Sequence, residues 1–322
     1  MRRPRSRWAA RCWPLFLAAL LLTGAGLTGE ALAVPRGAAG AATAKAPPTP
    51  LLWKVSGRDG ATLYLLGSFH LLRPDDYPLA PEVDAAFAHA TRVLFELPAE
   101  QVQSPALAAQ MLQAATRTDG RSLRDDLTPA RWAALQTYAA QHGLALDALS
   151  GYDPWFVALT VSLSEMAAQG LDPSLGLDQH FMRAAQQANK PTGGLETATE
   201  QIALLDGMSA DEQQQMLAEA LDDARDGNQQ TRALHDAWRR GDATRLWSEM
   251  GLDMKREYPA LYRNINVERN DRWLPKLEQR LQAGQGTTLV IVGSLHLLGP
   301  DGVVEKLRAR GYQVDRICET CK

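Results

Sequence analysis

A short strand-like segment that ends in a histidine occurs twice, near the two ends of the chain. Residues 62–72 read TLYLLGSFHLL and residues 288–298 read TLVIVGSLHLL, with seven identities in eleven positions. Each copy is a continuous apolar run followed by Gly-Ser, one further residue and His. Apolar runs of this length are typical of buried parallel strands. We therefore expect one sheet to contain strands from both ends of the chain.

The spacing of glycine and histidine in the two copies predicts a shared pocket. Gly67 and Gly293 are expected to let the chain turn sharply as it leaves the sheet. His70 and His296 then lie just beyond the carboxyl ends of their strands, where open α/β sheets place their sites. In the alternative, the repeat is a folding unit whose histidines bond only to the backbone. The convergence of two titratable groups at one edge favours a site.

Glu96 is the third candidate, because it interrupts the apolar run RVLFEL at residues 92–97. Burying an unpaired carboxylate costs several kcal/mol. Glu96 must therefore face solvent at the strand end, pair with a basic side chain or bind a metal. A simple ion pair with an arginine is the alternative to a functional role. Two imidazoles and a carboxylate suit a divalent ion with an open coordination position, which can activate water as a nucleophile.

The order of the predicted elements indicates one α/β domain over residues 51–322. Its mixed sheet is built from both chain ends, and a large helical insertion covers about residues 100–260. Strand patterns are found at Leu51–Val55, Thr62–Leu66, Val93–Leu97, Thr287–Val292 and Tyr312–Ile317. Capping signals predict helices that begin at Thr128-Pro129, Asp153-Pro154, Asp178 and Ser209, and further helices are expected over 229–240, 242–254 and 267–283.

The N-terminus has the pattern of a secretory signal over residues 1–33. A basic stretch precedes an apolar run at Trp13–Leu22, and Ala31-Leu32-Ala33 matches a cleavage site. An uncleaved membrane anchor is the alternative, but the apolar core is shorter than the roughly 20 residues of a spanning helix. Residues 34–50 are rich in Ala, Gly and Pro and are expected to form a flexible tether. We expect a secreted protein, periplasmic if the source is a diderm bacterium.

Charge and cysteine content limit the partners of the mature chain. Residues 1–33 hold five of the 34 basic and one of the 37 acidic residues, so the remainder carries a formal charge of −7. This argues against nucleic acid, whose backbone binds basic surfaces. No later segment is apolar enough to span a membrane stably. Cys318 and Cys321 are expected to form a local disulfide, since a redox-active pair normally sits at a helix N-terminus.

Several segments together resemble the TraB/GumN family, over about residues 51–317. They are LYLLGSFHLL, VLFELP, GLDQHF, KPTGGLET, VERNDRWLPKL and the closing TLVIVGSLHLLGPDGVVEKLRARGYQV. The family includes the Tiki Wnt-cleaving metalloproteases. The resemblance implies a fold related to erythromycin esterase and ChaN-like proteins, and a metal-dependent peptidase activity in the Tiki branch. By position, the residues that match the family's motifs are His70, Glu96, His296, the Arg269-Asn270 pair, Asp178 and Glu196.

The additional positions have other interpretations from the sequence alone. Asp178 is also a good helix N-cap. Glu196 either enters the pocket or stabilises the first turn of the next helix. Arg269 pairs with Glu96, polarises a substrate carbonyl, or lies on a solvated helix face. The remaining histidines lack partners at ligand spacing and are expected to be structural or exposed: His89, His142, His180 and His235.

These observations favour a secreted metal-dependent hydrolase, with a peptide or protein substrate. His70, Glu96 and His296 would hold Zn, Mn or Co, and Arg269 would stabilise an oxyanion. One alternative is a non-catalytic protein that binds a peptide or haem in the same pocket. Another is a metal-free esterase in which Glu96 orients His70 as the general base.

Overall fold

The computed structural model describes residues 45–284 and 286–319 of the 322-residue chain. A six-stranded sheet has the order β4-β3-β5-β2-β1-β6. The parallel neighbours are β4, β3, β5 and β2, while β1 is antiparallel to both β2 and β6. The prediction of a mixed sheet built from both chain ends is confirmed. The strands are β1 Leu52–Ser56, β2 Thr62–Ser68, β3 Arg92–Phe95, β4 Thr192–Gly194, β5 Thr287–Gly293 and β6 Gln313–Ile317.

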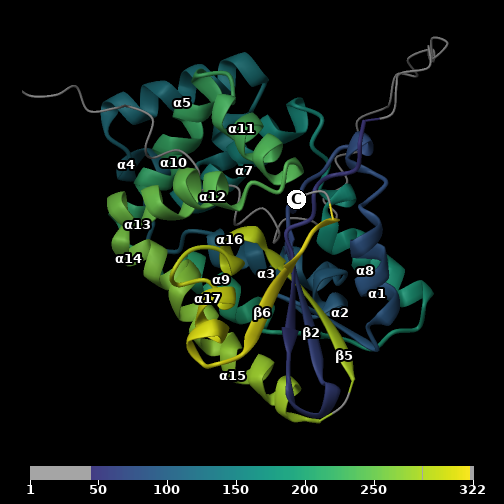
Figure 1. Ribbon diagram of the computed structural model, residues 1–322. Helices are drawn as coiled ribbons and strands as arrows, with labels where there is room; N and C mark the ends of the chain where they lie inside the picture. The colour runs from purple at the N-terminus through teal and green to yellow at the C-terminus, as the bar shows by residue number, and fades with distance from the viewer. Residues whose placement is uncertain (1–44, 285, 320–322) are drawn as a thin grey trace, which may run out of the picture.

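The two strands of the repeated motif are direct neighbours. Strands β2 and β5 pair in parallel, with Thr62 opposite Thr287 and Ser68 opposite Gly293. Both strands are largely buried because helices flank the sheet: α15 (Glu268–Gln282) and α17 (Val303–Ala309) lie on one side in Figure 1, and α1 (Pro81–His89) and α8 (Leu177–Gln187) on the other. The carboxyl ends of β2 and β5 therefore meet at one edge, as the sequence predicted.

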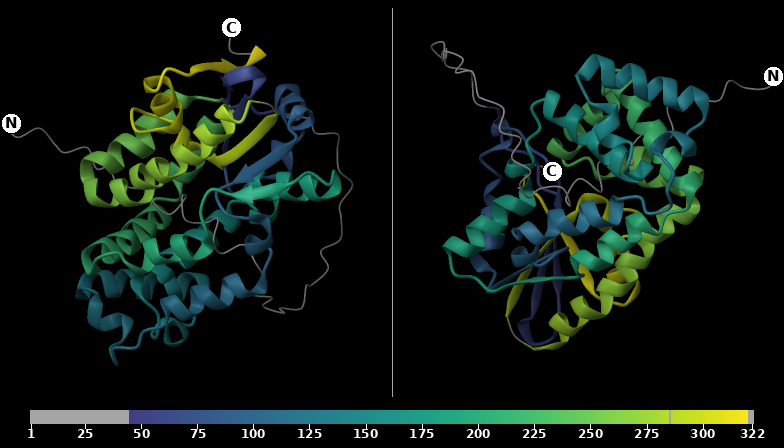
Figure 2. Two further views of the ribbon diagram at one scale, coloured as in Figure 1. Left: turned by 90° about the horizontal axis from the view of Figure 1, so that it is seen from below. Right: turned by 180° about the vertical axis from the view of Figure 1, so that it is seen from behind.

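Most of the remaining helices lie between β3 and β5 and form the predicted insertion, which also supplies the short strand β4. Figure 1 shows α5, α7, α10, α11 and α12 grouped beyond the edge of the sheet where α16 follows β5, and Figure 2 shows the molecule from below and behind. The insertion helices are α2 Ala99–Val102, α3 Pro105–Ala115, α4 Leu123–Asp126, α5 Pro129–His142, α6 Leu146–Leu149, α7 Pro154–Ala168, α9 Ala198–Asp206, α10 Ala210–Arg225, α11 Gln229–Arg239, α12 Ala243–Leu246, α13 Asp253–Glu257 and α14 Pro259–Tyr262; α16 Ser294–Leu297 follows β5.

Local capping signals explain several helix starts, with one exception. The Thr128 side chain accepts a hydrogen bond from the Arg131 amide at the start of α5, and a reciprocal pair between Ser209 and Glu212 opens α10. Helix α8 instead has Gly176 as its N-cap. Asp178 lies in the first turn of α8, so its interpretation as an N-cap is wrong.

Two π-helical segments interrupt the chain before α15: η6 (Trp247–Leu252) and η7 (Arg263–Val267). The regular helix that we predicted over 242–254 is therefore broken into α12, η6 and α13. Extra residues in π turns rotate the side chains that follow, and such turns are frequent at functional sites. Segment η7 leads directly into α15, which carries Arg269.

The predicted signal and residues 34–44 of the predicted tether lie outside the described residues. Residues 45–50 lie against α11, where the Thr49 amide donates to the carbonyl of Arg239 at 2.8 Å. Within the described ranges, no helix has the length and apolar character needed to span a membrane. Cys318 is disulfide-bonded, and Cys321, its predicted partner, lies outside the described residues.

Candidate functional site

The first motif turn is held by the segment that leads into α8. The Leu177 amide donates to the carbonyl of Phe69 at 3.2 Å. Gly176 packs so closely that a Cβ there would lie 1.9 Å from the carbonyl oxygen of His70, so only glycine fits. This approach brings the first turn of α8 beside His70, and the Asp178 carboxylate lies 2.7 Å from His70 Nδ1.

The second motif copy continues into the one-turn helix α16, which carries His296. Asn270 Nδ2 donates to the carbonyl of Asp301 at 2.8 Å, which leaves Asn270 Oδ1 facing His296 Nδ1, also at 2.8 Å. An amide oxygen only accepts, so Nδ1 of His296 carries the proton and Nε2 is an acceptor. The Asp178 carboxylate likewise requires a proton on His70 Nδ1.

Glu96 and Glu196 lie side by side because β3 and β4 are parallel neighbours. Beyond the strands, the Glu196 amide donates to the carbonyl of Glu96 at 2.9 Å. The two carboxylates are only 6% and 3% exposed. Glu196 therefore lies beside Glu96, in line with one of its two predicted positions, and the two buried acids need a common source of positive charge.

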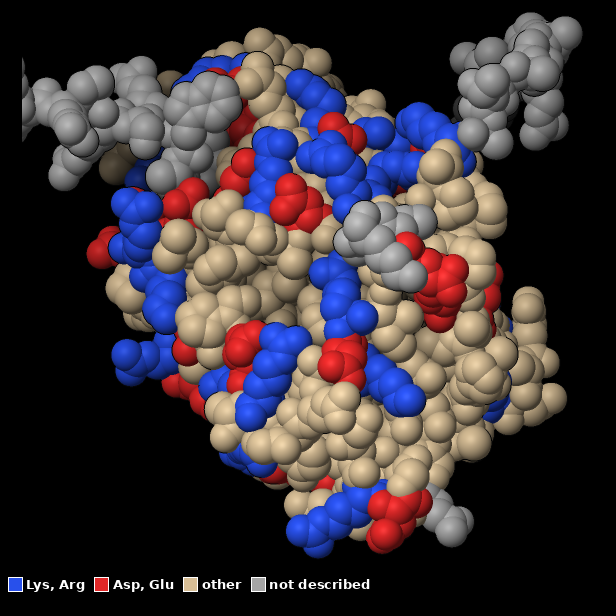
Figure 3. Space-filling model, viewed as in Figure 1, with Lys and Arg blue, Asp and Glu red and all other residues tan. Residues whose placement is uncertain are grey.

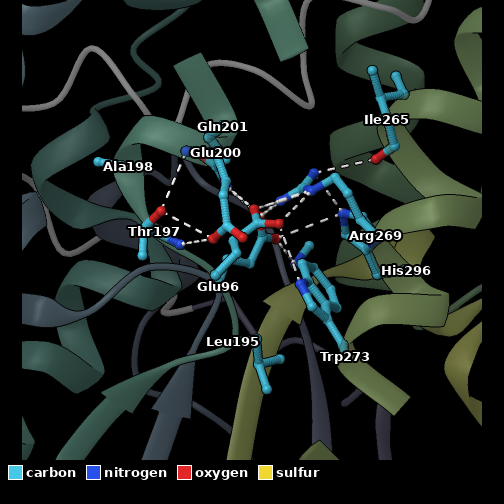
Figure 4. Close-up of polar contacts among 12 residues, drawn as sticks. Glu96, Leu195, Thr197, Ala198, Glu200, Gln201, Ile265, Arg269, Trp273 and His296 are labelled. Carbon is cyan, nitrogen blue, oxygen red and sulfur yellow. Dashed lines mark hydrogen bonds and ion pairs between the residues drawn. The ribbon is translucent and has the colours of Figure 1, made fainter. Parts of the chain in front are cut away.

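Arg269 from α15 supplies that charge. Its Nε donates to both oxygens of Glu196 at 3.0 and 3.1 Å, and Nη2 donates to Glu96 Oε2 at 2.6 Å. Its Nη1 lies 3.0 Å from His296 Nε2 (Figure 4). Burial would lower the pKa of Arg269, but the two carboxylates outweigh it and raise the pKa. The predicted pairing with Glu96 is present, and the solvated-face interpretation is wrong.

Two site residues escaped the sequence analysis. Gln201 Nε2 donates to Glu96 Oε2 at 3.1 Å and to Glu196 Oε1 at 2.6 Å. Trp273 Nε1 donates to Glu196 Oε2 at 3.2 Å, and its ring lies 4.4 Å from that of His296. Trp273 follows Arg269 by four residues, a helical spacing that places both on one face and could have identified it.

Glu96 Oε1 is the point on which the two imidazoles converge. It accepts from the Gly293 amide at 2.7 Å, and the Nε2 atoms of His70 and His296 each lie 3.9 Å from it. A Cβ on Gly293 would lie 3.2 Å from both Glu96 Oε1 and His70 Nε2. The structure therefore brings together His70, Glu96 and His296 from three neighbouring strands.

The motif glycines are required for space rather than for a sharp turn. Gly67 lies inside β2, while the chain does turn into α16 at Gly293, but neither glycine has the positive φ that would require glycine. A Cβ on Gly67 would lie 3.0 Å from Ser294 Oγ and 3.1 Å from Leu51 Cβ. Both glycines allow neighbouring segments to approach closely.

The two histidines have opposite electrostatic surroundings. Burial alone would lower the pKa of His70, but Asp178 and Glu96 outweigh it and raise the pKa to about 9. Burial, reinforced by Arg269, lowers the pKa of His296 to about 3. Burial would raise the pKa of Glu96, but Arg269 and both imidazoles lower it to about 2. Without a metal and at neutral pH, His70 is therefore the protonated, positively charged imidazole, and His296 is neutral.

The raised pKa of His70 predicts that the metal-free protein loses stability in alkaline solution. A folded pKa near 9, above the ordinary 6.5, means that the stabilisation is complete below pH 6.5 and is lost as pH rises through 9. We expect the free energy of unfolding, measured by urea denaturation with a chelator present, to fall by roughly 3 kcal/mol across this window. His70→Gln should lack this component. Equal losses in both proteins would contradict the prediction.

The donor atoms fit a divalent ion, although the side chains do not form a ready-made cage. Across the described ranges, no group of three or more His, Cys, Asp or Glu side chains has a metal-holding arrangement. Arg269 engages both Glu96 Oε2 and His296 Nε2. However, each Nε2 atom lies 3.9 Å from Glu96 Oε1. An ion between such a nitrogen and this oxygen could bond to both, because each bond is about 2.0–2.2 Å long. Both imidazoles direct Nε2 toward Glu96 Oε1 while an oxygen holds Nδ1, as in metal-binding histidines. A bound ion would have to replace Arg269 at His296 Nε2 and a proton at His70 Nε2.

The charges of the site also fit a cation. Glu96, Glu196 and Asp178 oppose Arg269 and, in the metal-free protein at neutral pH, the protonated His70. When His70 gives up this proton to bind an ion, two negative charges are left uncompensated. A divalent ion would cancel them, as buried charges require. That these residues hold a metal stays a prediction.

A cavity of about 590 Å³ lies elsewhere, between α3, the start of α7 and α9. Arg117, Asp153, Thr199 and Asp206 are among its lining residues, and none of the predicted site residues is. Helix α9 therefore separates the cavity from the site, with Gln201 on the site side.

Comparison with known proteins identifies the family. The family model described as TraB/PrgY/gumN family matches residues 51–316. The chain is 22% identical over 246 residues to "Uncharacterized protein YbaP" of Escherichia coli (strain K12), which covers 76% of this chain and 87% of YbaP, and the same figures hold for YbaP of Shigella flexneri. No solved structure matches the chain significantly. The match over most of the chain, including both histidine motifs, means that the chain belongs to the TraB/PrgY/gumN family.

Proposed function

We propose that the chain is a secreted metal-dependent hydrolase that cleaves peptide bonds. One observation carries this proposal: the Nε2 atoms of His70 and His296 both lie 3.9 Å from one oxygen of Glu96. Asp178 and Asn270 hold the other nitrogen of each ring at 2.7 and 2.8 Å. Such partners orient histidine ligands and increase their basicity.

The side chains of the site have separate roles in this proposal. His70, Glu96 and His296 would hold the ion, which would polarise a carbonyl and lower the pKa of water. Asp178 keeps the His70 ring in one orientation. Arg269 is a fixed positive charge beside His296, suited to stabilise negative charge that develops on the substrate oxygen.

A peptide or protein is the substrate that we propose, rather than a nucleic acid. The chain after residue 33 has a formal charge of −7. On the face seen in Figure 3, basic and acidic side chains are interspersed. Binding to a nucleic acid backbone needs a concentration of basic side chains. The N-terminal signal pattern supports secretion, with a periplasmic location in a diderm bacterium.

A second candidate is hydrolysis without a metal, and the contact between His70 and Asp178 favours it. A carboxylate 2.7 Å from Nδ1 orients an imidazole for general acid–base catalysis. From the sequence we expected Glu96 to orient His70. In this candidate the orienting residue is Asp178 instead. Glu96 is already held by Arg269 and Gln201.

The test combines elemental analysis with hydrolysis of a peptide library. We expect the purified protein to contain, or to require, Zn, Mn or Co, and we expect a chelator to abolish cleavage until one of these ions is restored. Full activity in the chelated, metal-free protein would overturn the proposal and favour the second candidate. Binding of haem with a Soret band, without turnover of any peptide, would instead favour the non-catalytic alternative.

A further inference from the structure

Gln201 is a buried amide that touches both glutamates of the site. Its side chain is 5% exposed, and Nε2 lies 3.1 Å from Glu96 Oε2 and 2.6 Å from Glu196 Oε1. An amide nitrogen carries two hydrogens and can donate one to each carboxylate. Gln201 therefore bridges two acids that repel each other.

The start of α9 determines where Gln201 lies. The Thr197 amide donates to Glu200 Oε2 at 2.7 Å, and the Thr197 hydroxyl accepts from the Glu200 amide at 3.3 Å. This reciprocal pair starts the helix directly after Glu196. The first turn then directs Gln201 back toward the carboxylates, as Figure 4 shows for Gln201 and Glu96.

The two oxygens of Glu96 have different surroundings. Oε2 accepts from Gln201 and from Arg269, while Oε1 accepts from the Gly293 amide and faces the two imidazoles. The last torsion of a glutamate is soft, so a carboxylate with few donors can turn about it. Donors at both oxygens oppose this rotation. Arg269 makes one hydrogen bond to Glu96 and three to Glu196, so Gln201 supplies the second of the two side-chain donors at Glu96 Oε2.

We infer that Gln201 is a positioning residue that fixes the plane of the Glu96 carboxylate, so that Oε1 stays directed at the Nε2 atoms of His70 and His296. The effect of Gln201 on cation binding rests on the proposed function. The effect of Gln201 on the orientation of Glu96 does not. A purely structural Gln201 would stabilise α9 without influencing Glu96.

The first measurement is the affinity of the full chain for Mn²⁺, after removal of bound metal. Gln201→Met keeps the length of the side chain and removes both donated hydrogens. We expect it to weaken Mn²⁺ binding about 10- to 100-fold, the usual effect of losing a partner that orients a ligand. Gln213→Met is the matched control, since Gln213 Nε2 donates to the Met208 carbonyl at 3.1 Å, away from the site. Gln201→Met with wild-type affinity would overturn the inference.

The second measurement needs no metal. Hydrogen exchange of the Gly293 amide reports the bond to Glu96 Oε1, and the Ile291 amide in β5 serves as an internal reference. In metal-free Gln201→Met we expect exchange at Gly293 to accelerate about tenfold or more, without a change at Ile291. If the wild-type protein binds no Mn²⁺, the proposed function fails, and this exchange still decides the role of Gln201. Unchanged exchange at Gly293 would sink the inference.

Discussion

Replacement of Arg269 by leucine is expected to destabilise the protein by about 3–5 kcal/mol, the usual cost of removing one partner from a buried ion pair. The guanidinium is 3% exposed and is shared by Glu96 and Glu196, which are themselves buried. Without it, the hydrogen bonds that side chains of the described residues donate to the two adjacent carboxylates come from the amide of Gln201 and the indole of Trp273. Urea denaturation at pH 7 measures the loss.

Two comparisons identify electrostatics as the cause. Arg308→Leu removes an exposed ion pair with Glu305 and a hydrogen bond to the Val314 carbonyl, which together should cost no more than about 2 kcal/mol. Adding Glu96→Gln and Glu196→Gln to the Arg269→Leu variant should restore part of the stability, because the uncompensated charges are then absent. If Arg269→Leu costs no more than Arg308→Leu, the network does not stabilise the fold as its geometry indicates.

Local signals in the sequence account for much of the fold. The apolar runs that form β2 and β5 need burial on both faces, and they therefore predicted strands from both chain ends in one covered sheet. Thr128-Pro129 and Ser209 to Glu212 predicted helix starts because a cap needs only residues within one turn. The π segments η6 and η7 have no comparable local signal.

The site residues that could be predicted are polar residues within apolar stretches of sequence. His70, His296 and Glu96 are polar groups at the ends of apolar strands, and that conflict made them visible. Gln201 is an ordinary residue within an ordinary helix. Its contact with Glu96 spans 105 positions of sequence and depends on how α9 packs beside β3.

Asp178 shows a different limit of sequence analysis. A carboxylate at the start of a helix can cap that helix or contact a residue of another element, and the sequence is compatible with both. Only the close approach of Gly176 to the His70 carbonyl decides between them, because it brings α8 beside the first motif turn. The repeat predicted where the histidines lie, but not which groups orient them.

Loss of any one of the three converging side chains is expected to weaken Mn²⁺ or Co²⁺ binding by more than about 100-fold, beyond the 10- to 100-fold effect of losing a partner that only orients a ligand. The variants are His70→Ala, His296→Ala and Glu96→Gln. Isothermal titration of metal-free protein gives the affinities, and the visible absorption of Co²⁺ shows whether the coordination changes.

Two buried residues of the described ranges that make no hydrogen bond or ion pair with the three converging side chains separate loss of a ligand from loss of stability. His235 is 1% exposed, and its Nε2 lies 2.8 Å from Asp76 Oδ2, so His235→Ala also removes a buried, carboxylate-bound imidazole. Glu165 is 7% exposed and accepts from Tyr138 and Asn228, which makes Glu165→Gln the counterpart of Glu96→Gln. Both controls should lower the free energy of unfolding and retain cation affinity, because neither side chain faces Glu96. If the site variants and the controls lose affinity equally, cation binding follows overall stability, and the convergence of His70 and His296 on Glu96 has no specific role in it.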